Sequence, residues 1–309
     1  MRSEFNSLYE LFEAIPDERA AIDYFKAIRW KTGEFCPHCG HDKVYAFASG
    51  PSAGKMWKCA QCRERFSMKT GTIFEDSNIA IRKWLAAIWF ITSHKKGIAS
   101  TALAKDIDVT QKTAWFMLHR LRHAARTRSF NRPLRGVVEI DETFVGGKES
   151  NKHANKRQHK GRGGVGKVIV FGMLERGGEL RAAPIEDMKA DRVRVLIRKQ
   201  VKPGAAVMTD EHGSYQGLNR RFKHETVNHG QGEYVRGDAH VNSIEGAWAL
   251  LKRQIYGIHH FVSPKHLHRY VAESVWRYNR RDVKDAPRMA EFLGRTDGRL
   301  AYRTLIAKA

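Results

Sequence analysis

The chain has 309 residues, which is enough for one to three domains with a sizeable core. Its 55 Lys and Arg against 33 Asp and Glu give a formal net charge of +22, an excess that indicates a polyanionic partner. No stretch of about 18 apolar residues occurs and the N-terminus lacks an apolar signal core, so we expect neither a membrane span nor export. Nucleic acid is therefore the expected partner, with a cytoplasmic, nucleoid-associated location.

Apolar residues in the first part of the chain recur with helical spacing. Over residues 5–29 this spacing is interrupted near Pro16, which predicts two short amphipathic helices with a packing role.

The cysteines form two CxxC pairs separated by nineteen residues. This spacing is typical of a structural Zn²⁺ held by four thiolates, and residues 44–47 and 55–58 between the pairs can form the strands of a zinc ribbon. His38 and His41 are alternative ligands, although a bystander role is the simpler interpretation. The predicted ligands of one Zn²⁺ are Cys36, Cys39, Cys59 and Cys62.

Two further helical segments follow the cysteines. Asp76-Ser77-Asn78 precedes an apolar helix over 79–94 and provides a capping signal. Residues 100–107, a turn at Asp108-Val109 and a second helix capped by Thr110 then have helix-turn-helix proportions. Any pair of antiparallel helices could share these proportions, but the basic charge favours DNA binding. The candidate DNA-binding residues are Gln111, Lys112, Thr113, Arg120, Arg122 and Arg126.

The C-terminal half alternates strand and helix patterns and places acids at strand ends. A β-branched strand over 137–145 contains Asp141 and ends at a Gly-Gly turn. Residues 148–167 are a basic, low-complexity loop that suits either a DNA backbone or plain solvation. We then expect a hairpin at 168–186, a helix at 191–201, a strand at 205–210 ending in Asp210, a strand at 223–228, and a helix capped by Asn242 or Ser243.

This element order resembles the ribonuclease-H-like fold of transposases and retroviral integrases. Asp141, Asp210 and Glu245 then match the family's Asp-Asp-Glu triad, with 34 residues between the last two and Lys252 seven residues beyond. Together with the zinc knuckles, the phrases Ile-Asp-Glu-Thr-Phe-Val-Gly-Gly-Lys and Thr-Asp-Glu-His-Gly-Ser-Tyr make the chain similar to ISXO2-like insertion-sequence transposases over residues 36–279.

The resemblance implies an enzyme that binds the terminal inverted repeats of an insertion sequence, cleaves the 3′ strand ends and joins them to target DNA. It implies catalysis by Asp141, Asp210, Glu245 and Lys252, with the three acids holding two Mg²⁺ (or Mn²⁺), and a homo-oligomer (a dimer or larger) on double-stranded DNA. Clustered carboxylates repel one another unless cations lie between them, and hard divalent ions prefer such oxygen ligands.

Alternatives remain for the third ligand and for the function. Asn242 lies one helical turn before Glu245 and could replace it, although an anionic oxygen binds Mg²⁺ better. Glu142, Glu211 and Asp238 are nearby acids that we do not expect to act. The rival function is a zinc-ribbon and helix-turn-helix DNA-binding regulator with an inactive ribonuclease-H-like domain, and a purely hydrolytic nuclease would share the metal site.

The predicted fold class is multidomain α/β, with an N-terminal zinc ribbon and helix-turn-helix before a C-terminal ribonuclease-H-like mixed sheet with flanking helices. The expected regions are N-terminal helices at 1–30, the zinc ribbon at 31–76, the helix-turn-helix domain at 77–130, the catalytic domain at 131–290 and a tail at 291–309.

Overall fold

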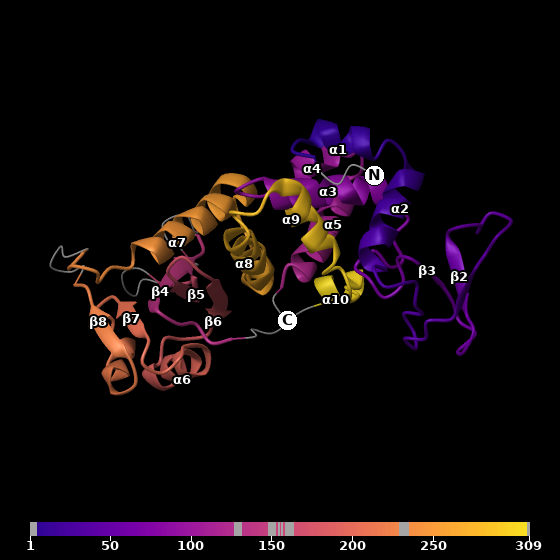
Figure 1. The fold of residues 1–309 in the computed structure, drawn as a ribbon. Helices are drawn as coiled ribbons and strands as arrows, with labels where there is room; N and C mark the ends of the chain where they lie inside the picture. Colours follow the sequence, from indigo (N-terminus) through magenta and orange to yellow (C-terminus); the bar gives the residue numbers. More distant parts are fainter. Residues whose placement is uncertain are drawn as a thin grey trace. The chain divides into compact units, whose positions relative to one another are not determined.

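The structure is a computed structural model that describes residues 5–126, 132–147, 153, 155, 157, 164–228 and 235–307. The chain forms two compact units, one of residues 1–125 with 282–309 and one of residues 126–281 (Figure 1). Most of the predicted basic loop at 148–167 lies outside the described residues.

The first unit combines a three-stranded sheet with helices. The sheet has the order β1-β2-β3, with antiparallel neighbours, and it is the predicted ribbon between and after the cysteine pairs. The elements of this unit are α1 (Leu8–Ala14), α2 (Glu18–Arg29), β1 (Val44–Ala46), β2 (Met56–Cys59), β3 (Arg65–Ser67), α3 (Ile81–Ser93), α4 (Ser100–Asp106), α5 (Gln111–Ala124), α9 (Asp285–Leu293) and α10 (Tyr302–Ile306).

A residue far away in the sequence caps α3. The helix starts two residues later than predicted, and its N-cap residue, Ala80, offers no side-chain hydrogen bond. The carboxylate of Glu18 instead accepts hydrogen bonds from the backbone N–H groups of Ile81 and Arg82, at 2.7 and 2.9 Å. The capping signal expected at residues 76–78 was therefore wrong, because a carboxylate on α2 satisfies the first N–H groups of the helix.

The C-terminal segment belongs to the first unit. Helix α9 packs against α3, and Arg288 of α9 donates a hydrogen bond to the carbonyl oxygen of Thr92 at 2.9 Å. Residues 282–290 were expected to close the catalytic domain, whereas the compact second unit ends at Arg281. The amphipathic pattern of α9 does not reveal which core the helix joins.

The second unit is built on a five-stranded mixed sheet of order β6-β5-β4-β7-β8. Strand β4 is antiparallel to β5, which is antiparallel to β6, whereas β7 runs parallel to both β4 and β8. The main elements are β4 (Val137–Val145), β5 (Val168–Glu175), β6 (Leu180–Ile185), α6 (Ala190–Gln200), β7 (Ala206–Thr209), β8 (Lys223–Thr226), α7 (Asn242–Gln254) and α8 (Pro264–Asn279); η3 (Gly213–Tyr215), η4 (Leu218–Arg220) and η6 (Ile255–His259) are short helical turns.

Alternate residues of β4 serve two cores. Val138 and Ile140 pack in one core with Val193 and Ile197 of α6, and Val145 packs in the other with residues of α7 and α8. Helices α7 and α8 thus cover one face of the sheet and α6 the other (Figure 1). Because side chains alternate along a strand, the odd-numbered residues of β4 face α7.

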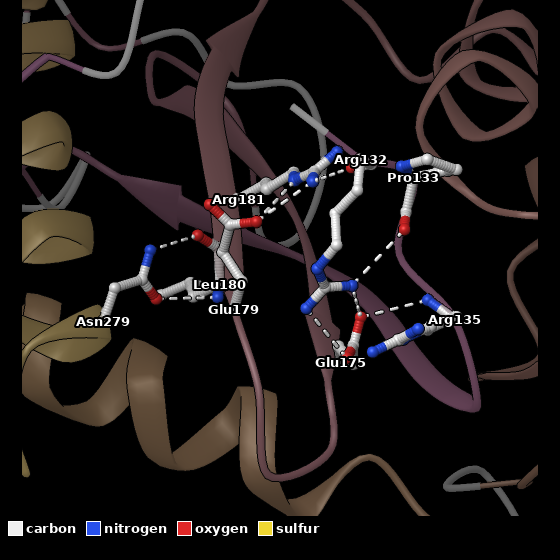
Figure 2. A network of polar contacts seen from close by, with 8 residues as sticks. All are labelled: Arg132, Pro133, Arg135, Glu175, Glu179, Leu180, Arg181 and Asn279. Atoms are coloured by element: carbon white, nitrogen blue, oxygen red, sulfur yellow. Dashed lines mark hydrogen bonds and ion pairs between the residues drawn. The ribbon is translucent and has the colours of Figure 1, made fainter. Parts of the chain in front are cut away.

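Polar contacts tie the turn end of the β5–β6 hairpin to neighbouring segments, as Figure 2 shows. Glu175 accepts two hydrogen bonds from the Arg132 guanidinium, at 2.7 and 3.1 Å, and one from the backbone N–H of Arg135 at 3.0 Å. The side-chain amide of Asn279, at the end of α8, bonds both the N–H and the carbonyl oxygen of Leu180, at 2.8 and 2.9 Å. These contacts hold the segment leading into β4, and the end of α8, against the sheet.

Candidate functional site

The four cysteines come together in the first unit. Their sulfur atoms all lie within 4.8 Å of one another, and the Cys36–Cys62 and Cys39–Cys59 sulfur pairs are each 3.6 Å apart. Zn–S bonds of about 2.3 Å in a tetrahedral site require sulfur separations of about 3.8 Å, so the cluster fits a structural Zn²⁺. All four protein ligands are sulfur, which leaves no open position for catalysis.

The two helices expected to contact DNA are present with the predicted turn. Thr110 caps α5 by accepting a hydrogen bond from the Thr113 N–H at 3.2 Å, and Asp108 in the turn has a φ of +50°. Gln111 and Lys112 are exposed at the start of α5, although the Gln111 amide also donates to Ser100 Oγ of α4 at 2.9 Å.

Two arginines of the predicted DNA-binding set are buried. Arg120 is 6% exposed and donates to the carbonyl oxygens of Ile73 and Glu75, at 2.8 and 3.0 Å, and its burial lowers the pKa of its guanidinium. Arg122 is only 1% exposed. Residues 117–122 of α5 are all buried, so neither arginine is available to DNA, which corrects the expectation, whereas Arg126 is exposed.

The sheet brings Asp141 and Asp210 to one edge. Strands β4 and β7 are parallel, with Glu139 opposite Met208. Continued by two residues, this register places Asp141 opposite Asp210, which directly follows β7. Both side chains then point to the face covered by α7, because Met208 and Val145 share that core.

The charge environment of Asp141 is unusual. Burial, and then the negative charges of Glu142 and Asp210, raise the pKa of Asp141 from 3.8 to about 7. Crowding of carboxylates in a half-buried edge disfavours their charged forms unless a cation compensates. The donor set therefore fits a hard divalent cation, which commonly takes one or two carboxylates with substrate phosphate completing its shell.

Glu142, next to Asp141 on β4, is hydrogen-bonded by a tyrosine that follows Asp210 in the chain. Its Oε2 accepts a hydrogen bond of 2.6 Å from the hydroxyl of buried Tyr215, which lies in η3 shortly after Asp210. Burial raises the pKa of Glu142, and the Tyr215 bond opposes this shift. Adjacent residues of a strand face opposite sides of a sheet, so Glu142 points away from the face on which Asp141 lies. In the sequence, only the presence of two consecutive acids at 141–142 hinted at the Tyr215 hydrogen bond.

Trp248 of α7 contacts Asp141 directly. The indole Nε1–H donates to Asp141 Oδ2 at 3.0 Å, and Asp141 pairs across β4 and β5 with Gly172. A Cβ atom at Gly172 would lie 2.5 Å from the Trp248 ring. The absence of a side chain at Gly172 therefore lets the indole lie close enough to the sheet to reach the carboxylate.

Glu139 docks the start of α7 on the sheet. Its fully buried carboxylate accepts from Ser243 Oγ and from the Ile244 N–H, each at 3.0 Å, and pairs with Arg176 at 2.6 Å. The N-cap residue of α7 is Val241, without a side-chain cap, so the predicted capping by Asn242 or Ser243 was wrong. As at α3, a distant glutamate performs this task, and local sequence rules cannot find it.

Helix α7 carries the other predicted site residues. Glu245, Asn242 and Lys252 are all exposed on it, and Glu245 lies one turn before Trp248. Among the residues that the structure describes, the four cysteines are the only close group of three or more possible metal ligands. Asp141, Asp210 and Glu245 therefore do not form a compact triad in this structure.

Comparison with known proteins identifies the class. Residues 16–65 match the family described as a transposase zinc-ribbon domain, which together with the cysteine cluster supports a structural Zn²⁺. Residues 133–279 match the family described as an ISXO2-like transposase domain. A protein in the transposable element ISH50 of Halobacterium salinarum is 34% identical over 248 residues, or 76% of this chain and 82% of that protein. The chain belongs to the ISXO2-like transposase family, which confirms the resemblance drawn from the sequence.

Solved structures are similar only at a low level. A simian T-cell lymphotropic virus intasome has 13% identity and a TM-score of 0.28, over 57% of this chain and 63% of that chain. The Mos1 strand transfer complex has 12% identity and a TM-score of 0.27, over 70% of this chain and 79% of that chain. No helix among the described residues is long and apolar enough to cross a membrane.

Proposed function

We propose that this protein cuts the 3′ strand at the ends of an insertion sequence and joins each 3′ end to target DNA. The observation that carries the proposal is the closeness of Asp141, in the middle of β4, to Asp210, just after the parallel strand β7: burial and the negative charges of Glu142 and Asp210 raise the pKa of Asp141 to about 7. A DNA-binding protein that had lost catalysis would not benefit from negative charge gathered where phosphates must approach.

Asp141 and Asp210 are the residues that would hold Mg²⁺ or Mn²⁺. Two such ions, when bound, would supply charge stabilisation to the attacking and leaving oxygens of an in-line phosphoryl displacement. Trp248 fixes one oxygen of Asp141 and the His212 N–H fixes Oδ1 of Asp210, at 3.0 Å each, so both carboxylates are oriented before any ligand arrives. Preorganised ligands are what a metal site requires.

Glu245 is the proposed third ligand, and Lys252 a phosphate contact. Helix α7 passes over Asp141 through Trp248, and positions three, four and seven apart share one side of a helix. Glu245 and Lys252 therefore flank the point at which the helix meets the carboxylate edge. Asn242, one turn earlier on the same helix, remains the competing ligand.

The first unit is proposed to bind the terminal repeats of double-stranded DNA. Helices α4 and α5 are proposed as a helix-turn-helix, with Gln111, Lys112 and Thr113 toward base edges and Arg126 toward a phosphate. Cutting and joining of two element ends requires at least two sites, so we also propose a homo-oligomer on DNA.

A cleavage and joining assay tests the assignment, with DNA ends taken from the sequence that flanks the reading frame. Asp141→Asn, Asp210→Asn and Glu245→Ala should each abolish metal-dependent cleavage and joining while repeat binding persists. If Glu245→Ala still joins ends and Asn242→Ala does not, Asn242 is the third ligand. If Asp141→Asn and Asp210→Asn retain cleavage, the proposed function is wrong.

A further inference from the structure

We propose that a hollow beyond the C-terminal end of α7 binds one unpaired nucleotide of the DNA strand that is processed at the carboxylates. The hollow has a volume of about 510 Å³ and lies wholly within the second unit. This inference rests on the proposed function for the identity of the strand, although the binding itself needs no catalysis. The lining residues that matter are Gly146, Lys167, Lys252, Tyr256, His260 and Phe261.

The walls of the hollow are built by specific contacts. The Tyr256 hydroxyl accepts from the Gly146 N–H at 3.2 Å and donates to the Gly146 carbonyl at 3.1 Å, which joins the turn after β4 to η6. Gly146 has a φ of +157°, and a Cβ there would lie 3.1 Å from Lys167, so a glycine lets the two segments approach. A π-helical turn at Ile255–His259 and a positive φ of +59° at His260 lead from α7 to Phe261.

The lining combines aromatic faces with positive charge. Phe261 is 69% exposed and Tyr256 is 42% exposed, although large aromatic side chains are ordinarily buried. The positive charge comes from Lys167 and Lys252, which line the same hollow as His260, and none of its described lining residues is acidic. Exposed rings on which bases stack, beside cations that bind phosphates, are how proteins hold single-stranded nucleic acid.

An unpaired nucleotide fits better than duplex DNA. Stacking on the face of Phe261 requires a free base face, and duplex bases already use both faces in the stack. The volume lies within the range of about 300–1,000 Å³ found for sites that enclose small ligands. A duplex is too wide to enter such a hollow, whereas a single base with its phosphate can.

The hollow lies one short step from the proposed catalytic edge. Phe144, which lines it, is three residues beyond Asp141 on β4, or about 10 Å at the rise of a strand. Lys252 is seven residues beyond Glu245, about 10 Å along α7. One strand of a duplex advances about 3.4 Å per nucleotide, so a strand that stays paired between the carboxylates and the hollow places the nucleotide about three positions from the cut at its mouth.

The experiment measures binding by full-length protein without added divalent metal. The probes are a fluorescein-labelled thymidine 12-mer and a 12-base-pair blunt duplex. Phe261→Ala should weaken 12-mer binding by at least about fivefold, the factor for about 1 kcal/mol, and change duplex binding by less than about twofold. Phe261→Trp should retain 12-mer affinity. Tyr9→Ala, which removes a 73% exposed ring outside the hollow, is the matched control and should leave both affinities unchanged.

A second readout locates the base. With 2-aminopurine placed singly along the 12-mer, wild-type protein should quench its fluorescence by stacking, and Phe261→Ala should restore that fluorescence. Equal losses on 12-mer and duplex, or no loss of 12-mer affinity, would overturn the proposal. If Phe261→Ala loses 12-mer affinity while Asp141→Asn still cleaves DNA, the nucleotide site stands and the proposed function is wrong. The two failures are therefore distinguishable.

Discussion

The Trp248 indole donates a 3.0 Å hydrogen bond to Oδ2 of Asp141, and so links the middle of α7 to the central strand of the sheet. Glu139, two residues earlier on the same face of β4, accepts from the N–H of Ile244 in the first turn of that helix. One strand therefore positions both the proposed metal ligand and the helix that carries Glu245. Variants at these contacts should separate folding from chemistry.

Gly172 should be intolerant of a side chain. Gly172→Ala places a methyl group against the Trp248 ring, and we expect a loss of about 1–3 kcal/mol in the free energy of unfolding. Gly246→Ala is the matched control, because its Cβ meets nothing within 4 Å and alanine favours a helix by about 0.5–1 kcal/mol. Urea denaturation of both proteins checks the prediction. Equal stability of the two variants would show that the indole does not need the space above Gly172.

Loss of the Glu139 charge should destabilise the second unit. Glu139→Gln weakens the ion pair of the fully buried Glu139 carboxylate with the partly exposed Arg176, and also the cap of α7, so we expect a cost of about 3 kcal/mol. Glu186→Gln, which removes an exposed partner of Arg192, should change stability by less than about 0.5 kcal/mol. Denaturant midpoints measure both, and a Glu139→Gln protein as stable as the control would contradict the docking role.

Stability without added divalent metal should depend on pH through Asp141. Its pKa is raised to about 7 in the folded chain from an ordinary value of 3.8. The folded state therefore binds the proton more tightly, and this contribution to stability is full below about pH 4 and is lost as pH rises through 7. Asp141→Asn should raise the melting temperature at pH 8 and have little effect near pH 4. Thermal melts of both proteins across this range are the measurement, and a gain of equal size at both pH values would contradict the assignment.

Zinc should be confined to the four thiolates. Cys59→Ser should lower the zinc content of purified protein well below one per chain, and His38→Ala should leave it unchanged. Chelation should then increase hydrogen exchange around residues 36–67 and leave residues 164–228 protected, because the two units have separate cores. Zinc retained by Cys59→Ser would remove this ligand set.

Local patterns predicted most of the elements, because α5, α6, β4 and β7 are each governed by apolar period, turn residues or a local cap such as Thr110. The contacts that position the site come from distant residues. Glu18 and Glu139 cap helices that follow them by 63 and 105 residues, and the buried face of α5 holds Arg120 away from solvent. The sequence pattern identified Asp141 and Asp210 as candidate site residues. The Trp248 hydrogen bond and the space above Gly172 could not be predicted, because they depend on tertiary packing.

The central claim is that Asp210 is required to join DNA ends. Its most direct test compares Asp210→Asn with Asp238→Asn in the joining of a precut 3′ end to target DNA with Mg²⁺. Asp210 directly follows β7 and lies opposite Asp141 when the β4–β7 register is continued by two residues. Asp238 is an exposed acid between β8 and α7. We predict that Asp210→Asn joins no detectable DNA while it still binds the element end, and that Asp238→Asn joins at the wild-type rate. Joining by Asp210→Asn within about tenfold of wild type would contradict the account.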